Sequence, residues 1–86
     1  MDKYIVVFVH PFIMGQHIYI YNDNGECEKS FVSNFDSAPK EIINIAYSYE
    51  IKKIHLRGNR FFTLKIRDNI TNLTSYDKNK IEIILD

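Results

Sequence analysis

The apolar residues of this chain form two kinds of pattern, and the first is a continuous run. Tyr4 to Val9 are six apolar residues in succession. A strand with one solvated face alternates apolar and polar residues, whereas a strand covered on both faces is apolar throughout. Tyr4 to Val9 therefore predict a central strand covered on both sides, and Ile81 to Leu85 predict a final, mostly buried strand.

An alternating pattern follows the first run. From His17 to Tyr21, isoleucines alternate with histidine or tyrosine, which is strand periodicity. The Asn-Asp-Asn-Gly sequence at 22–25 is typical of a hairpin turn, and the more polar residues 27–33 predict an edge strand. The first third of the chain thus predicts a three-stranded meander.

The period then changes to that of a helix. Ser37 is a candidate cap and Pro39 is tolerated in a first turn, and both precede an apolar stripe of helical spacing. Its members are Ile42, Ile45, Ala46 and Tyr49. Residues 51–56 predict a strand, and a strand-helix-strand order favours a parallel crossover beside the Tyr4 strand.

Residues 61–73 fit two structures. Phe62, Leu64 and Ile66 alternate as in a strand, and Gly58-Asn59 suits a hairpin turn. A helical stripe through Phe62, Ile66, Ile70 and Leu73 explains more of the segment, with Asn59 or a neighbour as its cap. We prefer the helix. The prediction is one α/β domain over residues 1–86, with the order βββαβαβ, a mixed five-stranded sheet and two helices.

Composition limits the function classes. The chain has 86 residues, 45% of them hydrophobic, and no apolar run approaches the roughly 20 residues that span a bilayer. With the single Cys27 and no export signal, we expect a cytoplasmic protein without disulfides, membrane contact or cofactors. The net charge is zero, but residues 1–50 hold three bases and seven acids, whereas residues 51–86 hold eight bases and four acids.

The element order resembles the ribonuclease H-like fold in the short form shared with Holliday-junction resolvases and their phage relatives. Members of that group that cut nucleic acid place an Asp on the first strand and a Glu at the end of the fourth. The matching stretches read Val-His-Pro-Phe at 9–12 and Leu-Arg-Gly at 56–58, so both carboxylates are absent. Two-metal cleavage requires several convergent carboxylates. The resemblance implies a scaffold without nuclease activity, such as a small accessory or host-directed phage protein.

One candidate ligand site follows from the predicted topology. Ligands of parallel sheets bind near the carboxyl ends of the strands, where His10, Arg57 and Asn59 would gather as an anion pocket. The simpler alternative is that Arg57 pairs with a surface carboxylate and His10 bonds to the backbone. The three histidines, His10, His17 and His55, lie on separate predicted strands and share no ligand spacing, so we expect no metal site.

Six bases between residues 52 and 67 occur without an acid and suggest a nucleic-acid surface, with a solvated basic face as the alternative. They are Lys52, Lys53, Arg57, Arg60, Lys65 and Arg67.

The six tyrosines and six phenylalanines suggest a protein interface instead. Tyr19, Tyr21 and Tyr47 are its candidate residues, although aromatic residues of this number also fill cores. Our leading hypothesis is a non-catalytic protein that binds another protein or a second copy of itself. The second is nucleic-acid binding, and the third is an anion-binding or vestigial catalytic pocket at His10 and Arg57.

Overall fold

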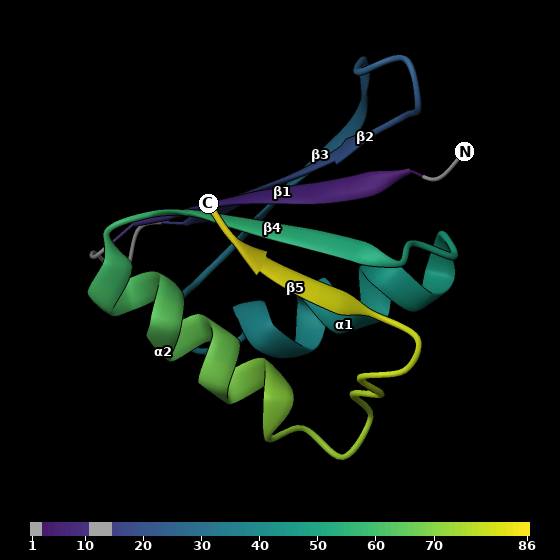
Figure 1. Cartoon of the computed structure of the whole chain (residues 1–86). Helices are drawn as coiled ribbons and strands as arrows, with labels where there is room; N and C mark the ends of the chain where they lie inside the picture. Colours follow the sequence, from purple (N-terminus) through teal and green to yellow (C-terminus); the bar gives the residue numbers. More distant parts are fainter. Residues whose placement is uncertain (1–2, 11–14) are drawn as a thin grey trace.

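One mixed sheet organises the molecule, and its central strand is the continuous apolar run. The computed structural model describes residues 3–10 and 15–86. In chain order the elements are β1 (Tyr4–Val9), β2 (Gln16–Tyr21), β3 (Cys27–Ser33), α1 (Ala38–Ser48), β4 (Lys53–Gly58), α2 (Arg60–Thr71) and β5 (Glu82–Leu85). The strand order is β3-β2-β1-β4-β5 (Figure 1).

Strand directions match the prediction. β2 runs antiparallel to β1 and to β3, whereas β4 runs parallel to β1 and to β5. The α/β class, the order βββαβαβ and the mixed five-stranded sheet are therefore confirmed. The arrangement is compatible with a nuclease-like fold.

The β2–β3 hairpin closes at the predicted turn. The backbone N–H of Gly25 donates to the Asn22 carbonyl at 3.0 Å, and Gly25 has a φ of 82°. The side-chain oxygen of Asn22 accepts from the backbone N–H groups of Asn24 and Glu26 at 2.9 and 3.0 Å. An Asn that bonds its own turn and a Gly that tolerates positive φ explain why this sequence reverses here.

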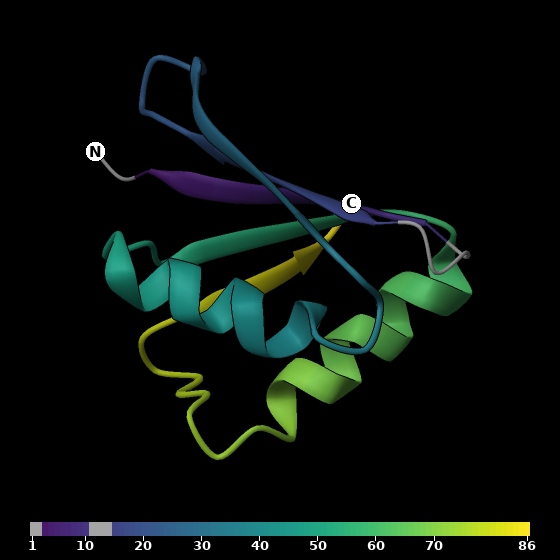
Figure 2. The ribbon, with the colours of Figure 1, turned by 180° about the vertical axis from the view of Figure 1, so that it is seen from behind.

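Both helices pack against the same face of the sheet (Figures 1 and 2). The core lies between the sheet and this helix layer, and it includes Ile5, Val7, Ile18, Ile54 and Leu56, all fully buried. The continuous run in β1 was predicted to be covered on both sides. The helices cover one face, and on the opposite face, where no described helix or loop lies over β1, cover comes from neighbouring side chains and is incomplete: Val6 is 2% exposed and Phe8 is 37% exposed.

The first helix begins at the predicted place but by a different cap. Ser37 is the residue before α1, yet its side chain makes no capping bond to the helix. Asn34 stabilises this turn instead, because its side-chain oxygen accepts from both the backbone N–H and the hydroxyl of Ser37 at 2.9 Å. The Asn34 carbonyl also accepts from the backbone N–H of Ala38 at 2.9 Å.

The end of α1 contains a residue in the left-handed conformation. Glu50 has a φ of 56°, its N–H donates to the Tyr47 carbonyl, and the N–H of Ile51 donates to the Ala46 carbonyl at 2.7 Å. This is the hydrogen-bond pattern of a Schellman motif, in which the left-handed position is usually Gly.

The segment after β4 is a helix, as preferred from the sequence. Asn59 caps α2 by accepting from the backbone N–H of Phe61 at 2.9 Å. Ile66 and Ile70 are fully buried and Phe62 packs against the core, whereas Leu73 lies beyond the helix, which ends at Thr71. Among the described residues, no helix is long and apolar enough to cross a membrane.

Candidate functional site

The face of the sheet opposite the helices, here called the open face, carries a strip of mostly aromatic side chains. Two adjacent strands supply it, because alternation sends every second residue of β1 and β2 to this side. The aromatic strip consists of Tyr4, Val6 and Phe8 on β1 and of His17, Tyr19 and Tyr21 on β2. The register pairs them in three rows: Tyr4 with Tyr21, Val6 with Tyr19, and Phe8 with His17.

The rings of the strip contact one another. Tyr4 and Tyr21 stack with their centroids 5.4 Å apart, and Phe8 meets Tyr19 edge to face at 5.6 Å. Tyr19 also stacks with His17 at 6.2 Å. The strip nevertheless remains accessible, since Phe8 is 37% exposed and His17 is exposed. A set of rings that is mutually packed and open to solvent is a preorganised apolar surface.

An ion pair borders the strip at the carboxyl ends of β4 and β5. Arg57 donates to the carboxylate of Asp86 at 2.6 Å, and His55 lies 3.2 Å from the other oxygen of the same carboxylate. The bond from Arg57 holds the pKa of Asp86 below its usual range, against the opposing effect of partial burial, and His55 adds to the lowering. Arg57 also lies over the Phe8 ring, 6.0 Å from its centroid.

A buried glutamine holds the other end of the strip. Gln16 is fully buried, and its side-chain oxygen accepts from the backbone N–H of His10 at 2.6 Å. Its side-chain nitrogen donates to the His10 carbonyl at 3.1 Å. The two bonds extend the β1–β2 pairing by one residue and place the His10 ring 5.6 Å from that of His17.

The residues predicted to form an anion pocket have structural partners. His10 and Asn59 do follow adjacent paired strands, but the Asn59 side chain caps α2 and Arg57 binds Asp86. Gly58, between Arg57 and Asn59, also has a structural role. Its φ is 130°, and a Cβ there would collide with the carbonyl oxygen of Val9, so the close approach is between two strands of the sheet.

The six bases of residues 52–67 are spread over several surfaces. Lys53 and Arg57 lie on the open face, since their partners in β1 are Tyr4 and Phe8. Lys52 precedes β4, where its carbonyl accepts from the N–H of Glu82. The other three bases are on α2: Arg60, Lys65 and Arg67.

On α2 the bases point in different directions. Arg60 and Arg67 lie near one line along the helix, because they are seven residues apart, whereas Lys65 projects from another side. Lys65 lies 5.7 Å from the Phe61 ring, and Arg67 binds Asp68 at 3.0 Å. The structure thus provides two separate pairs of bases and not a continuous basic face.

The three candidate interface tyrosines lie on two different sides of the molecule. Tyr19 and Tyr21 share the open face with His17, as strand periodicity indicated. Tyr47 is on α1 in the helix layer, and its hydroxyl donates to the Ser75 carbonyl at 2.6 Å. The bond fixes the loop before β5, which gives Tyr47 a structural role on the other side of the molecule.

Carboxylates do not converge at the carboxyl ends of the parallel strands. Asp86 is there, but it is paired with Arg57 and His55. Across residues 3–10 and 15–86, no group of three His, Cys, Asp or Glu side chains is placed to hold a metal ion. Pro11 and Phe12 of the stretch compared with the nuclease motif lie outside the described residues.

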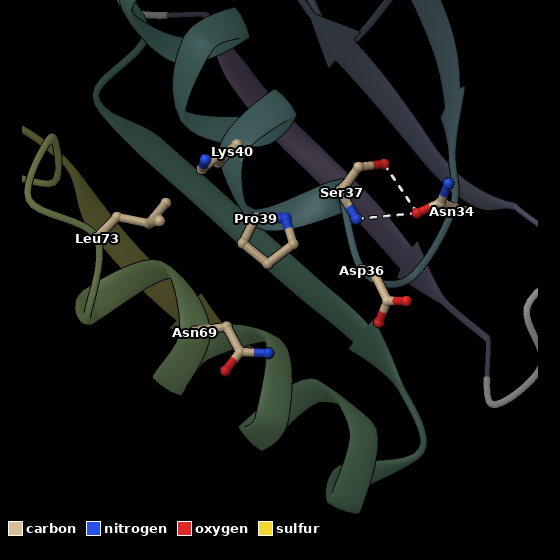
Figure 3. Close-up of a pocket in the computed structure, with 7 residues that line it drawn as sticks. All are labelled: Asn34, Asp36, Ser37, Pro39, Lys40, Asn69 and Leu73. Atoms are coloured by element: carbon tan, nitrogen blue, oxygen red, sulfur yellow. Dashed lines mark hydrogen bonds between the residues drawn. The ribbon is translucent and has the colours of Figure 1, made fainter.

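A hollow lies in the helix layer, between the start of α1 and the side of α2 (Figure 3). Its volume is about 510 Å³, and the lining includes Asp36, Lys40 and Asn69. The dashed lines in Figure 3 show that Asn34 and Ser37 bond each other across its rim, so these two polar groups stabilise the turn before α1.

Sequence reasoning missed three residues of the open face: Tyr4, Phe8 and Asp86. The signal for the first two was present, because a run of six apolar residues must send three side chains to each face of a strand. Asp86 carried no signal, since its bond to Arg57 joins residues 29 positions apart in the chain.

No protein-family model matches this chain, and the search of curated proteins finds no match.

Proposed function

We propose that this protein is a non-catalytic binding protein that contacts another protein through the open face of its sheet. The aromatic strip carries the proposal. Tyr and Phe are enriched at the centres of protein interfaces, since they give large contact areas at a small entropic cost. Phe8 at 37% exposure and the exposed His17 lie beside the half-buried Tyr4, Tyr19 and Tyr21, which makes one continuous apolar patch.

Charge favours a protein over a nucleic acid as the partner. On the open face, the bases Lys53 and Arg57 are accompanied by the carboxylates Glu82 and Asp86 on the next strand. Binding to a polyphosphate depends on an excess of unpaired bases. The balance of two bases and two carboxylates beside the strip does not provide one.

The proposed function also concerns the kind of domain that carries the open face. We infer a ribonuclease H-like domain from the element order and from the β3-β2-β1-β4-β5 sheet. In such a domain the nuclease positions at the ends of β1 and β4 would hold His10 and Arg57 in place of carboxylates. The paired state of Asp86 further supports a binding function without phosphodiester cleavage.

The test uses a crosslinking amino acid at two matched phenylalanines. Phe8 is on the open face and Phe61 is 64% exposed on α2. A photoreactive phenylalanine analogue at position 8, in cells that naturally make the chain, should capture a protein that the analogue at position 61 does not. The purified pair should then bind with a Kd that Phe8→Ala weakens at least about tenfold and Phe61→Ala leaves unchanged.

The salt dependence of binding and a DNA-binding assay distinguish protein binding from nucleic-acid binding. Affinity for the captured protein should change little between about 50 and 500 mM NaCl. Binding to a mixed-sequence single-stranded DNA that falls steeply with salt, and that is abolished by reversing Arg57 and Arg60 to Glu, would replace this proposal with nucleic-acid binding.

A further inference from the structure

Resting on the proposed function, we infer that the occupant of the open face is an amphipathic helix with an apolar stripe and an acidic flank. The aromatic strip matches a short helix in size. It is two strands wide and about six residues long, or about 10 by 20 Å from strand spacing and rise. A helix is about 10 Å wide, and about 13 residues span 20 Å.

The same sheet already shows how helices of this length cover it. α1 and α2, with 11 and 12 residues, cover the opposite face. A helix of similar length would therefore fit along β1 and β2 on the open face.

Area argues against a second copy as the occupant. A stable dimer buries about 800 Å² of accessible surface on each partner, whereas the strip covers only about 200 Å² of the sheet in projection. A larger symmetric contact could take in Val32, which is 65% exposed beside His17, but toward β4 and β5 it would have to desolvate Lys53, Arg57, Glu82 and Asp86.

Charge sets the orientation of the helix. The column next to the strip on the β4 side is Lys53, His55 and Arg57, while the carboxylates Glu82 and Asp86 lie one strand farther out on and beyond β5. A helix lying over β1 and β2 therefore meets Lys53 first, and Glu or Asp residues along that flank would pair with it. Lys53 is exposed at the start of β4 and is available for such a contact.

The experiment selects binders from a display library of random peptides about 16 residues long, using the intact protein as bait. Selected peptides are then measured against Phe8→Ala and against His17→Glu, which places a carboxylate on the strip. Circular dichroism and urea unfolding establish that each variant is folded; His17 is exposed, so its variant remains informative if Phe8→Ala is unstable. Lys53→Glu tests the flank, with Lys65→Glu on α2 as its matched control.

The expected pool has apolar residues at i, i+3, i+4 and i+7 with Asp or Glu on one side, and the peptides become helical when bound. Phe8→Ala and His17→Glu should weaken them about tenfold. Lys53→Glu should weaken them about threefold, and Lys65→Glu should have no effect.

Other outcomes identify which inference fails. Peptides of period two, or peptides rich in basic residues, that still require Phe8 would overturn the acidic helix and leave protein binding by the open face in place. A pool indifferent to both strip variants would overturn both. A mass of two chains by light scattering that reverts to the 10.2 kDa monomer in His17→Glu would identify a second copy as the occupant.

Discussion

Gln16 offers the most direct test of what stabilises the β1–β2 pairing beneath the open face. Its side-chain amide bonds the backbone of His10 in the way that a neighbouring strand would. We expect Gln16→Met, which keeps the volume and removes both bonds to His10, to lower the free energy of unfolding by about 1–3 kcal/mol. The figure is two hydrogen bonds at about 0.5–1.5 kcal/mol each, and exposed His10 can recover part of it from water.

Gln16→Glu should make that loss depend on pH. When the introduced carboxyl is protonated, its hydroxyl can donate to the His10 carbonyl and its other oxygen can accept from the His10 N–H, as the amide does. When it is ionised, the donor is lost in a fully buried site. Burial raises the pKa of such a group above the unfolded value of about 4.3.

The raised pKa determines in which direction the stability of Gln16→Glu changes with pH. A carboxyl with a raised folded pKa gives its full stability below the unfolded pKa and loses it as the pH rises toward the folded pKa. A rise of two to three units corresponds to about 3–4 kcal/mol. Gln16→Glu should therefore match the wild type near pH 4 and be destabilised by about that amount near pH 7.

Urea unfolding followed by circular dichroism at both pH values, always as a difference from the wild type, measures the effect. The Met variant is the control, because it has no group that titrates at position 16. Equal losses for the Glu variant at both pH values, or no loss for the Met variant, would show that the Gln16–His10 bonds do not hold the strands.

Three further substitutions test the fold around the site. Glu50→Gly relieves the left-handed backbone at a gain of about 0.5–1 kcal/mol, which raises Tm by about 2–8 °C in thermal unfolding, whereas Glu50→Ala should leave Tm nearly unchanged. Gly58→Ala drives a Cβ against the Val9 carbonyl and should cost at least about 2 kcal/mol in urea; a variant as stable as the wild type would contradict this geometry. Asp86→Asn should cost less than about 1 kcal/mol near pH 7, since Arg57 is 49% exposed, and the difference should vanish as the pH falls below about 4, because the pKa of Asp86 is lowered by folding. A difference that persists at lower pH would exclude the ion pair as its cause.

The order of elements could be predicted because each element's period reports which side it buries. Ile18 and Ile20 face the helix layer and Tyr19 and Tyr21 face away, as a period of two requires. For residues 61–73 the longer helical stripe was the better guide, since Ile66 and Ile70 are buried in α2.

Contacts between distant segments could not be predicted from periodicity. The continuous run in β1 indicated cover on both faces, but it does not distinguish cover by a helix from cover by the rings of β2. Tyr47 was a candidate for binding because a helical position does not reveal that Ser75 lies beside it. From the sequence, Arg57 could either bind a ligand or pair with a carboxylate. The fold places Asp86 beside it, and Arg57 pairs with that carboxylate.

Val6 shows how the open face can be well packed in the absence of a partner. It is 2% exposed although no described helix lies above it, because its row partners Tyr19 and His55 and the neighbouring rings close over it. The rings are thus fixed before any partner arrives, and binding loses little side-chain entropy. If the whole footprint of about 200 Å² on each side were apolar surface removed from water, at about 25 cal/mol/Å², it would give at most about 10 kcal/mol. Association costs of about 4–15 kcal/mol consume most of that, so a helix held by the strip alone would dissociate readily. The acidic flank toward Lys53 would therefore contribute mainly the orientation of the helix on the strip.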